Sequence, residues 1–387
     1  MRPIRQYIED FPSIERDACF CSVDESTRAL LEKAAAEISK RPDLLADMEA
    51  IDTALTGDNA EWAAAPWRRS VEKGASPGES FLLAFPILHH LSHIRAFYEA
   101  RKIPERYLRA VMSDFQRWIV THREWTMGVP GFTEISWLRE HVCGRIFEIG
   151  RLQFQPSRWT STPTIPLINS RTQERLLLAK ADKDAVTTEG GFASALRANQ
   201  EGTVPLVCQE TPETITGHRI FTDGTISRTP ERFSTNEWKR ILNDGDPVIN
   251  IHIPCGTPLK PNACRESIRE ALQFFPKYFP DWPIAHAKAL LCVSWLLYPD
   301  FQKILAPTSN IVGFQKFFHP FPVPKAGDQQ FYERIFMPWN REITRDKLKT
   351  SLQRALFDHI ASGHTPHGGG GLIFPDEFSG NTAGSPR

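Results

Sequence analysis

Apolar residues recur every three or four positions through the first third of the chain. One series is Ala29, Leu30, Ala34 and Ile38, and similar series lie within residues 82–94, 108–119 and 135–146. This spacing places apolar side chains on one face of an α-helix. The pattern therefore predicts a helical N-terminal region, from about residue 26 to residue 147, with at least five helices.

The period of the pattern changes after Glu148. Leu152 and Phe154 alternate with polar residues, which is the two-residue period of a half-buried strand. Arg151 and Gln153 lie on the polar face of this strand, and we expect them to link the helical region to the sheet. Further strands are expected at 175–179 and 218–221, the latter before an Asp223-Gly224 turn, and a short helix at the capping-box-like run Ser234-Thr235-Asn236-Glu237.

The most informative stretch runs from Pro247 to Ala271. An apolar strand predicted at 248–254 breaks at Pro254-Cys255-Gly256 and leads into a helix that begins at Pro261. A second apolar strand is predicted at 289–297. A strand, a crossover helix and a parallel strand form a right-handed β-α-β unit whose buried strands are nearly continuous in apolar residues.

The rest of the second half contains shorter patterns that predict single elements. The four glycines of residues 368–371 indicate either a ligand contact or a mobile loop, within a last strand or loop at 367–374. The expected fold class is α+β. We expect a helical domain at residues 1–147, a mixed-sheet domain at 148–376 and a disordered tail at 377–387. Within the second domain we expect helices at 300–305, 309–317 and 346–361 and a strand at 331–337.

Composition narrows the class of partner. Lys and Arg together number 46, as do Asp and Glu, and this balance argues against a nucleic-acid partner. We expect no membrane span, because no apolar run approaches the roughly 18 residues that a spanning helix needs, and the N-terminus lacks the apolar core of a signal peptide. The seven cysteines lack the spacing of a disulfide framework or a zinc site. We expect a cytoplasmic protein without a metal, and no signal indicates an oligomeric state.

The helical region contains a cluster of three histidines, a residue type that binds metal ions. His89 and His93 lie one helical turn apart, with His90 between them. The sequence shows no carboxylate or cysteine beside them. We therefore expect a buried or partner-facing histidine pair rather than a metal site.

Four short runs carry a resemblance to a known family. They are Gly150-Arg151-Leu152-Gln153-Phe154-Gln155, Gly245-Asp246-Pro247-Val248 with His252-Ile253-Pro254-Cys255-Gly256, Cys292-Val293-Ser294-Trp295-Leu296-Leu297, and Ser309-Asn310-Ile311-Val312-Gly313-Phe314-Gln315. In this order they resemble bacterial acyltransferase-domain proteins, in which a helical N-acyltransferase N-terminal domain precedes a GNAT-like C-terminal domain. The resemblance extends from about Glu25 to Phe374. It implies transfer of an acyl group from acyl-CoA, as co-substrate, to a small-molecule amine by direct attack.

The resemblance also implies where CoA binds. In a GNAT-like sheet two neighbouring parallel strands splay apart around the thioester, and the next helix points its N-terminus at the pyrophosphate. The usual glycine-rich pyrophosphate loop is reduced here to Gly256. Lys260 would replace part of that loop with a point charge, or is simply solvated, and Ser309 caps a helix or contacts CoA. The expected CoA contacts are Ile253, Cys255, Gly256, Lys260, Ser309 and Asn310.

Three side chains are candidates for catalysis. His252 is the candidate base that removes the amine proton, because an imidazole pKa near 6.5 is close to neutral. Its alternative is a strand histidine bonded in the core or facing solvent. Ser294 contacts substrate or donates to the leaving thiolate, or is a structural hydroxyl. Tyr298 is the candidate general acid, because many GNAT enzymes use a tyrosine for that step.

Two other functions stay open. A degenerate GNAT-like module would bind CoA or a partner without turnover, which the missing glycines favour. A Cys-His acyl hydrolase would pair Cys255 or Cys292 with His252, although no orienting acid is evident.

Overall fold

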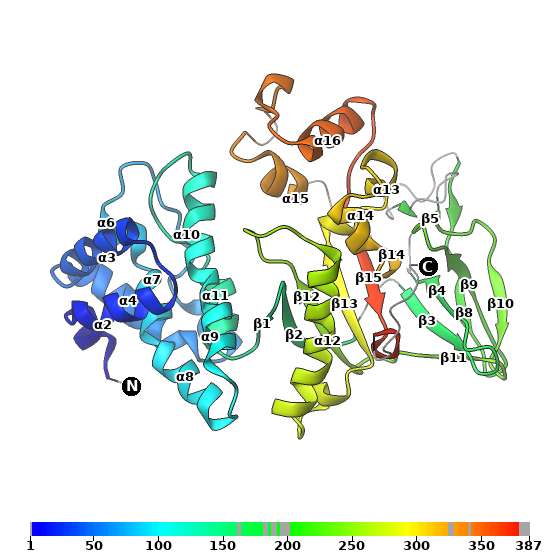
Figure 1. The fold of residues 1–387 in the computed structure, drawn as a ribbon, viewed down its shortest axis with the longest axis horizontal. Coiled ribbons are helices and arrows are strands. Elements are labelled where there is room, and N and C mark those ends of the chain that lie inside the picture. The colour runs from blue at the N-terminus through cyan, green and yellow to red at the C-terminus, as the bar shows by residue number, and fades with distance from the viewer. Residues whose placement is uncertain are drawn as a thin grey trace. The chain divides into compact units, whose positions relative to one another are not determined.

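The structure is a computed structural model that describes residues 2–160, 164–180, 185–186, 192–193, 202–323, 329–339 and 342–378, with side chains omitted at 185–186 and 192–193 (Figure 1). The chain forms two compact units. Unit 1 comprises Met1–Gln155 and Ile253–Thr257, and unit 2 comprises Pro156–His252 and Pro258–Arg387. The predicted domain boundary at residue 147 stays a prediction.

Unit 1 is helical, as the three-to-four-residue spacing predicts. Among the described residues no helix is both long and apolar enough to cross a membrane. The apolar faces meet in a core that includes Leu31, Ile51, Phe85 and Ile119. The helices are α1 (Ile4–Ile8), α2 (Phe11–Phe20), α3 (Glu25–Ile38), α4 (Pro42–Leu55), α5 (Asn59–Ala64), α6 (Pro77–Phe81), α7 (Ala84–His89), α8 (Leu91–Ala100), α9 (Glu105–Met112), α10 (Asp114–Trp125) and α11 (Ile135–Val142).

A β-hairpin follows the helices. Strand β1 (Phe147–Ile149) pairs antiparallel with the start of β2 (Leu152–Arg158). Gly150 occupies the turn with a φ of +64°, a conformation that glycine adopts without steric cost. The alternating pattern at residues 152–155 therefore predicted this strand correctly.

A buried polar network joins the hairpin to α10 and α11. Arg117 donates to Glu148 at 2.7 Å and to Asp114 at 3.1 Å, and Gln153 donates to Glu148 at 3.0 Å. Burial raises the pKa of Asp114, but the hydrogen bond and charge of His141 and the charge of Arg117 outweigh it and lower that pKa well below its ordinary value. Gln153 is therefore a link between the helices and the hairpin, as its place in the sequence suggests.

Unit 2 contains two larger sheets that pack face to face. One has the strand order β12-β13-β15-β14, and the other has the order β10-β9-β4-β3-β11, with β8 beside β9. Val248, Ala289 and Leu372 of the first sheet form one core cluster with Leu177 and Ile220 of the second. The strands are β3 (Thr164–Asn169), β4 (Arg175–Ala179), β5 (Ala185–Val186), β6 (Phe192–Ala193), β7 (Val204–Pro205), β8 (Cys208–Glu210), β9 (Thr214–Ile220), β10 (Glu231–Ser234), β11 (Trp238–Arg240), β12 (Pro247–His252), β13 (Ala289–Ser294), β14 (His319–Pro322) and β15 (Gly369–Ile373).

The predicted β-α-β unit is present. Strand β12 pairs parallel with β13, and α12 (Pro261–Tyr278) connects them. Helix α12 buries Cys264, Ile268 and Ala271 along one face. The fold class is α+β, as expected. The other helices are α13 (Phe301–Ile304), α14 (Asn310–Gln315), α15 (Gln329–Phe331) and α16 (Ser351–Ala361), with a π-helical turn at Tyr332–Phe336 and 3₁₀ turns at Pro283–His286, Trp295–Leu297, Arg345–Lys347 and Pro375–Glu377.

Two local predictions were wrong. Ser234 does not begin a helix: it ends β10, and β11 follows. The ring of Phe233 packs at 5.3 Å against Trp238, so strand pairing and aromatic packing override the capping-box pattern. Residues 331–337 are helical rather than a strand, because Phe331 and Ile335 both point into one apolar cluster, which is helical spacing. The strand predicted at 289–297 also ends earlier, at Ser294.

The glycine run is a buried strand in the middle of the first sheet. Strand β15 lies between β13 and β14, with Gly370 opposite both Val293 and Phe321. A Cβ atom at Gly370 would overlap the ring of Phe321, and one at Gly371 would lie 2.6 Å from the Cβ of Phe318. Close packing therefore accounts for the glycines, and neither a loop nor a ligand contact is needed.

The predicted tail falls mostly outside the described residues, at 379–387. The two described residues of that prediction are ordered. Glu377 ends a 3₁₀ turn, where its Oε1 lies 2.8 Å from His319 Nε2 and 3.3 Å from the guanidinium of Arg175. Phe378 is buried.

Replacing Gly370 should destabilise unit 2. We expect Gly370→Ala to cost about 1–3 kcal/mol of unfolding free energy, because the added methyl group meets Phe321 in a packed sheet. Urea unfolding measures this loss. The control is Gly217→Ala in β9, where an added Cβ would lie 3.2 Å from its nearest neighbour, Cδ1 of Leu178, and should cost clearly less. Equal stability of Gly370→Ala and wild type would contradict the packing role.

Candidate active site

Strands β12 and β13 stop pairing before they end. Their parallel register covers three positions, from Val248 opposite Ala289 to Asn250 opposite Leu291. Strand β12 continues to His252, while β13 continues to Ser294 and stays paired with β15 to its last residue. In open α/β sheets ligands bind beyond the carboxyl ends of parallel strands. This end of the sheet is the candidate active site.

One face of the sheet carries polar groups at this end. Side chains two residues apart on a strand share a face, so His252 lies on the face of Asn250, and Val293 lies on the face of Leu291. Val293 is 52% exposed, although it is apolar and lies in a central strand. The opposite face, with Ile251 and Cys292, is buried.

Asn250 was missed in the sequence. Its Oδ1 atom is buried and has no hydrogen-bond partner in the part of the chain that the structure describes, which is costly for a polar atom inside a sheet. It lies at the last paired position of β12, immediately before the strands separate. The signal was available, because an amide interrupts the apolar run Val248-Ile249-Asn250-Ile251.

His252 lies where it was expected. It is the last residue of β12 and is half-buried. Position and partial exposure suit a group that exchanges protons with a ligand at the end of the sheet.

Three expected CoA contacts belong to the segment after His252, and that segment belongs to unit 1. Ile253 is half-buried, Cys255 is exposed, and Gly256 has a φ of +100° with open space around its Cα. Arg151 fixes the end of the segment by donating to the carbonyl oxygen of Thr257 at 2.7 Å. The structure therefore groups these residues with the β1–β2 hairpin, whereas His252 and Lys260 belong to unit 2.

Lys260 is an exposed residue at the N-cap position of α12. It makes no side-chain cap, and the first turn that follows contains Pro261 and no acidic residue. The first turn of a helix offers unpaired backbone N–H groups and a positive partial charge. This end of α12 is therefore open to an anion.

Helix α14 packs beside that end. A Cβ atom at Gly313 would lie 2.6 Å from Cγ of Pro261, so the first turns of α12 and α14 are close together. Ser309 caps α14, because its Oγ accepts from the N–H of Ile311 at 3.3 Å. The structure thus brings the first residue of α12 against Gly313 of α14, one turn after Ser309. It agrees with the helix-cap interpretation of Ser309.

Ser294 has a local structural contact. It precedes the 3₁₀ turn at Trp295–Leu297, and its Oγ accepts from the N–H of Leu296 at 3.2 Å. The hydroxyl acts as an acceptor in this bond, so its own proton stays available to another acceptor.

Tyr298 is the centre of a buried cluster. It is 2% exposed, its hydroxyl donates to Asp300 Oδ2 at 3.0 Å, and His359 Nε2 lies 2.9 Å from the same hydroxyl oxygen. Burial, and then the charge of Asp300, raise the pKa of Tyr298 well above its ordinary value. Because a phenol has one proton, and that proton lies in the hydrogen bond to Asp300, Tyr298 acts here as a positioning group. No spacing pattern in the sequence pointed to Asp300 or His359.

The two candidate thiols differ in exposure. Cys292 is buried, and burial raises its pKa to about 12, so it carries almost no thiolate at neutral pH. It also lies on the sheet face opposite His252. These facts argue against a Cys292–His252 nucleophile pair.

The family models match both units. A GNAT-like C-terminal domain matches residues 146–373, and an N-acyltransferase N-terminal domain matches residues 20–144. The chain therefore belongs to the family of proteins that join these two domains. The resemblance seen in the sequence is confirmed. No curated protein matches the chain.

Solved acyltransferase structures share this fold. One, in complex with decanoyl-CoA and teicoplanin, has a TM-score of 0.60 and 20% identity over 92% of this chain and 86% of that one. A mutant acyltransferase with octanoyl-CoA has a TM-score of 0.59 and 19% identity over the same shares. A third, with CoA and 10C-teicoplanin, has a TM-score of 0.56 and 18% identity over 93% and 99%. The expectation of a GNAT-like acyltransferase is thus confirmed at the level of family and fold.

Removing the Tyr298 hydroxyl should destabilise unit 2. We expect Tyr298→Phe to cost about 1–3 kcal/mol, because Asp300 and His359 each lose a buried partner. Chemical denaturation measures the change. Tyr278→Phe, at the half-buried C-terminal end of α12, is the control and should lose clearly less. An unchanged midpoint for Tyr298→Phe would refute the positioning role.

Proposed function

We propose that this protein transfers an acyl group from a CoA thioester to an amine of a small molecule. The observation that carries the proposal is the early end of the β12–β13 pairing at Asn250 and Leu291, followed by a helix whose first turn is open to an anion. The first feature leaves room for a thioester between strand ends, and the second suits a diphosphate. The family of the chain supports the same class of reaction.

The donor we propose is a medium-chain acyl-CoA. Acyltransferases of the same fold were solved with octanoyl-CoA and with decanoyl-CoA, and one of them also with teicoplanin. Decanoyl-CoA is therefore the first donor to test here. We propose an amine as acceptor, and the balanced charge of the chain suits a small molecule rather than a polyanion.

The proposed reaction is a direct attack of the amine on the thioester carbonyl. His252 takes the proton from the attacking nitrogen, a C–N bond forms and the C–S bond breaks. The thiolate leaves, and the proton held by His252 passes to it or to solvent. Ser294 lies on the sheet face of Cys292, opposite His252, so its hydroxyl is not part of this proton path. Backbone N–H groups of Ile253 and Cys255 are the proposed donors to the thioester oxygen.

The proposed phosphate site is the first turn of α12. Lys260 supplies a positive charge at the N-cap position, and Ser309 and Asn310 lie at the adjoining end of α14. Gly256 is the remaining glycine of the usual loop. It is exposed and lies five residues before the first residue of α12. A point charge and backbone N–H groups thus stand in for a glycine cradle.

A binding module without turnover is the competing function, and the reduced glycine loop favours it. The two proposals separate on one measurement. Release of free CoA thiol from decanoyl-CoA, dependent on an added amine, supports transfer. CoA binding by calorimetry with no thiol release from any amine in a panel supports the module.

Loss of the base should slow the chemistry. We expect His252→Ala to lower kcat/KM with decanoyl-CoA and an amine roughly 100-fold or more, as removal of a general base does. The loss should shrink with rising pH as more amine becomes neutral. His286→Ala changes an exposed histidine ahead of β13 and is the matched control. Equal rates for His252→Ala and wild type would reject His252 as the base.

The phosphate site has its own test. We expect Lys260→Ala to raise KM for decanoyl-CoA roughly 1.4- to fivefold, because an exposed charge contributes about 0.2–1 kcal/mol. The same variant should leave KM for decanoyl-pantetheine unchanged, since that donor lacks the diphosphate. Lys277→Ala, at the other end of α12, is the control. An equal effect on both donors would place the phosphates elsewhere.

A further inference from the structure

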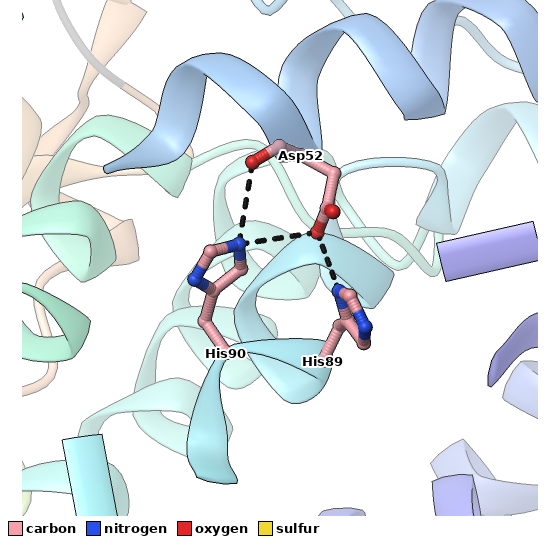
Figure 2. Close-up of side chains that lie close together, drawn as sticks. All are labelled: Asp52, His89 and His90. Carbon is pink, nitrogen blue, oxygen red and sulfur yellow. Dashed lines mark hydrogen bonds and ion pairs between the residues drawn. The ribbon is translucent and has the colours of Figure 1, made fainter. Parts of the chain in front are cut away.

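Three side chains of unit 1, none of them used in the proposed reaction, converge at one buried point. Asp52 comes from α4, and His89 and His90 come from the junction of α7 and α8 (Figure 2). Asp52 Oδ1 lies 2.8 Å from His89 Nδ1 and 3.3 Å from His90 Nε2. The exposed fractions of the three side chains are 12%, 5% and 2%. These groups are the carboxylate and imidazole ligands that zinc prefers.

The break between two helices makes this convergence possible. On an unbroken helix adjacent side chains point in directions about 100° apart. Here α7 ends at His89, and His90 is the cap residue between α7 and α8, so both rings reach Asp52. The sequence pattern drew attention to His89 and His93, but His93 is exposed, and the carboxylate partner comes from 37 positions before His89.

The two contacts of the His89 ring indicate a positive charge beside its Nδ1 atom. Its Nδ1 faces the carboxylate of Asp52, and its Nε2 faces the carbonyl oxygen of Arg2 at 2.8 Å. Both oxygens are acceptors, and a neutral imidazole has only one N–H. With the N–H donated to Arg2, a positive charge must lie between Nδ1 and Asp52. That charge is either a second ring proton or a metal ion.

A third group lies at the same point. His90 Nε2 is 3.3 Å from Asp52 Oδ1 and 3.2 Å from the backbone carbonyl oxygen of Asp52. One ligand atom from each of the three residues lies within 4.8 Å of the other two. A dication at about 2.0–2.2 Å from each atom would bind all three, once the proton of His90 Nε2 is released. The bond from His89 Nε2 to Arg2 is the outer contact that usually orients a ligating histidine.

We propose that Asp52, His89 and His90 form a binding site for a divalent transition-metal ion, Zn²⁺ by ligand type. The ion joins α4 to the α7–α8 junction. Through the hydrogen bond of His89 to Arg2, it also fastens the N-terminal segment of unit 1. Three protein ligands leave the fourth position of a tetrahedral zinc ion to water.

Metal binding to the purified full chain tests the proposal. After dialysis against chelator, titration with ZnCl₂ in a calorimeter should show one tight site, and elemental analysis should find one zinc per chain. Asp52→Asn and His90→Gln each remove a ligand and should weaken binding by at least about 100-fold. His93→Ala keeps all three ligands and is the matched control, because His93 is exposed on the same helix pair.

Two further readouts do not depend on how the variants fold. Co²⁺ bound to the wild-type chain should show the strong visible absorption of a tetrahedral site. Zinc binding should also release protons, measured as a dependence of the binding heat on buffer ionisation. Failure of the wild type to bind zinc or Co²⁺, or equal binding by Asp52→Asn, overturns the proposal and assigns the charge on His89 to a proton.

Discussion

The candidate site depends on one constraint: β13 pairs with β15 over more positions than it pairs with β12. Strand β13 is paired with β15 at five positions, from Leu290 to Ser294, but with β12 at only three, the last of which is Asn250 opposite Leu291. Strand β13 therefore stays with β15 after β12 has separated from it. The close approach of β15 to its neighbours needs the glycines, since a methyl group at Gly370 overlaps Phe321. Gly370 and Gly369 lie opposite Val293 and Ser294, so the glycines support the end of β13 at which we place the thioester.

Buried polar groups supply the specific contacts that apolar packing cannot. In unit 1, Asp114 and Glu148 bind Arg117 and so connect helices to the hairpin. In unit 2, Tyr298 connects Asp300 with His359. Each of these groups has its partners among the described residues, as buried polar atoms must. Asn250 Oδ1 differs from them, because it is buried without a partner, and it lies at the point where the strands separate.

Local pattern predicted much of the fold but little of the site. The helical spacing before residue 147, the alternation at 152–155 and the apolar strands around α12 all correspond to observed elements, because each pattern reports burial along a single element. The local pattern predicted the wrong structure at Ser234, where pairing between strands determined the fold. The partners Asp52 and His359 could not be predicted, since Asp52 lies 37 positions from His89 and His359 lies 61 positions from Tyr298. Asp300 is only two positions after Tyr298, but no spacing rule links such a pair outside a regular element. Asn250 could have been noticed as an amide in an apolar strand.

Burial decides which groups near the end of the sheet can exchange protons. Burial raises the pKa of Cys292 to about 12. Burial and the charge of Asp300 raise the pKa of Tyr298 well above its ordinary value, and its hydroxyl donates a hydrogen bond to Asp300. Neither group changes charge near neutral pH. His252 is half-buried at the last position of β12, and imidazole is the side chain whose ordinary pKa lies nearest neutral pH. The chemistry of amine acylation needs one such group, and the strand that carries it also carries the unpaired amide oxygen of Asn250 on the same face. Attack by an amine on this face would give that oxygen an N–H donor, so the acceptor, rather than CoA, is the better partner for Asn250.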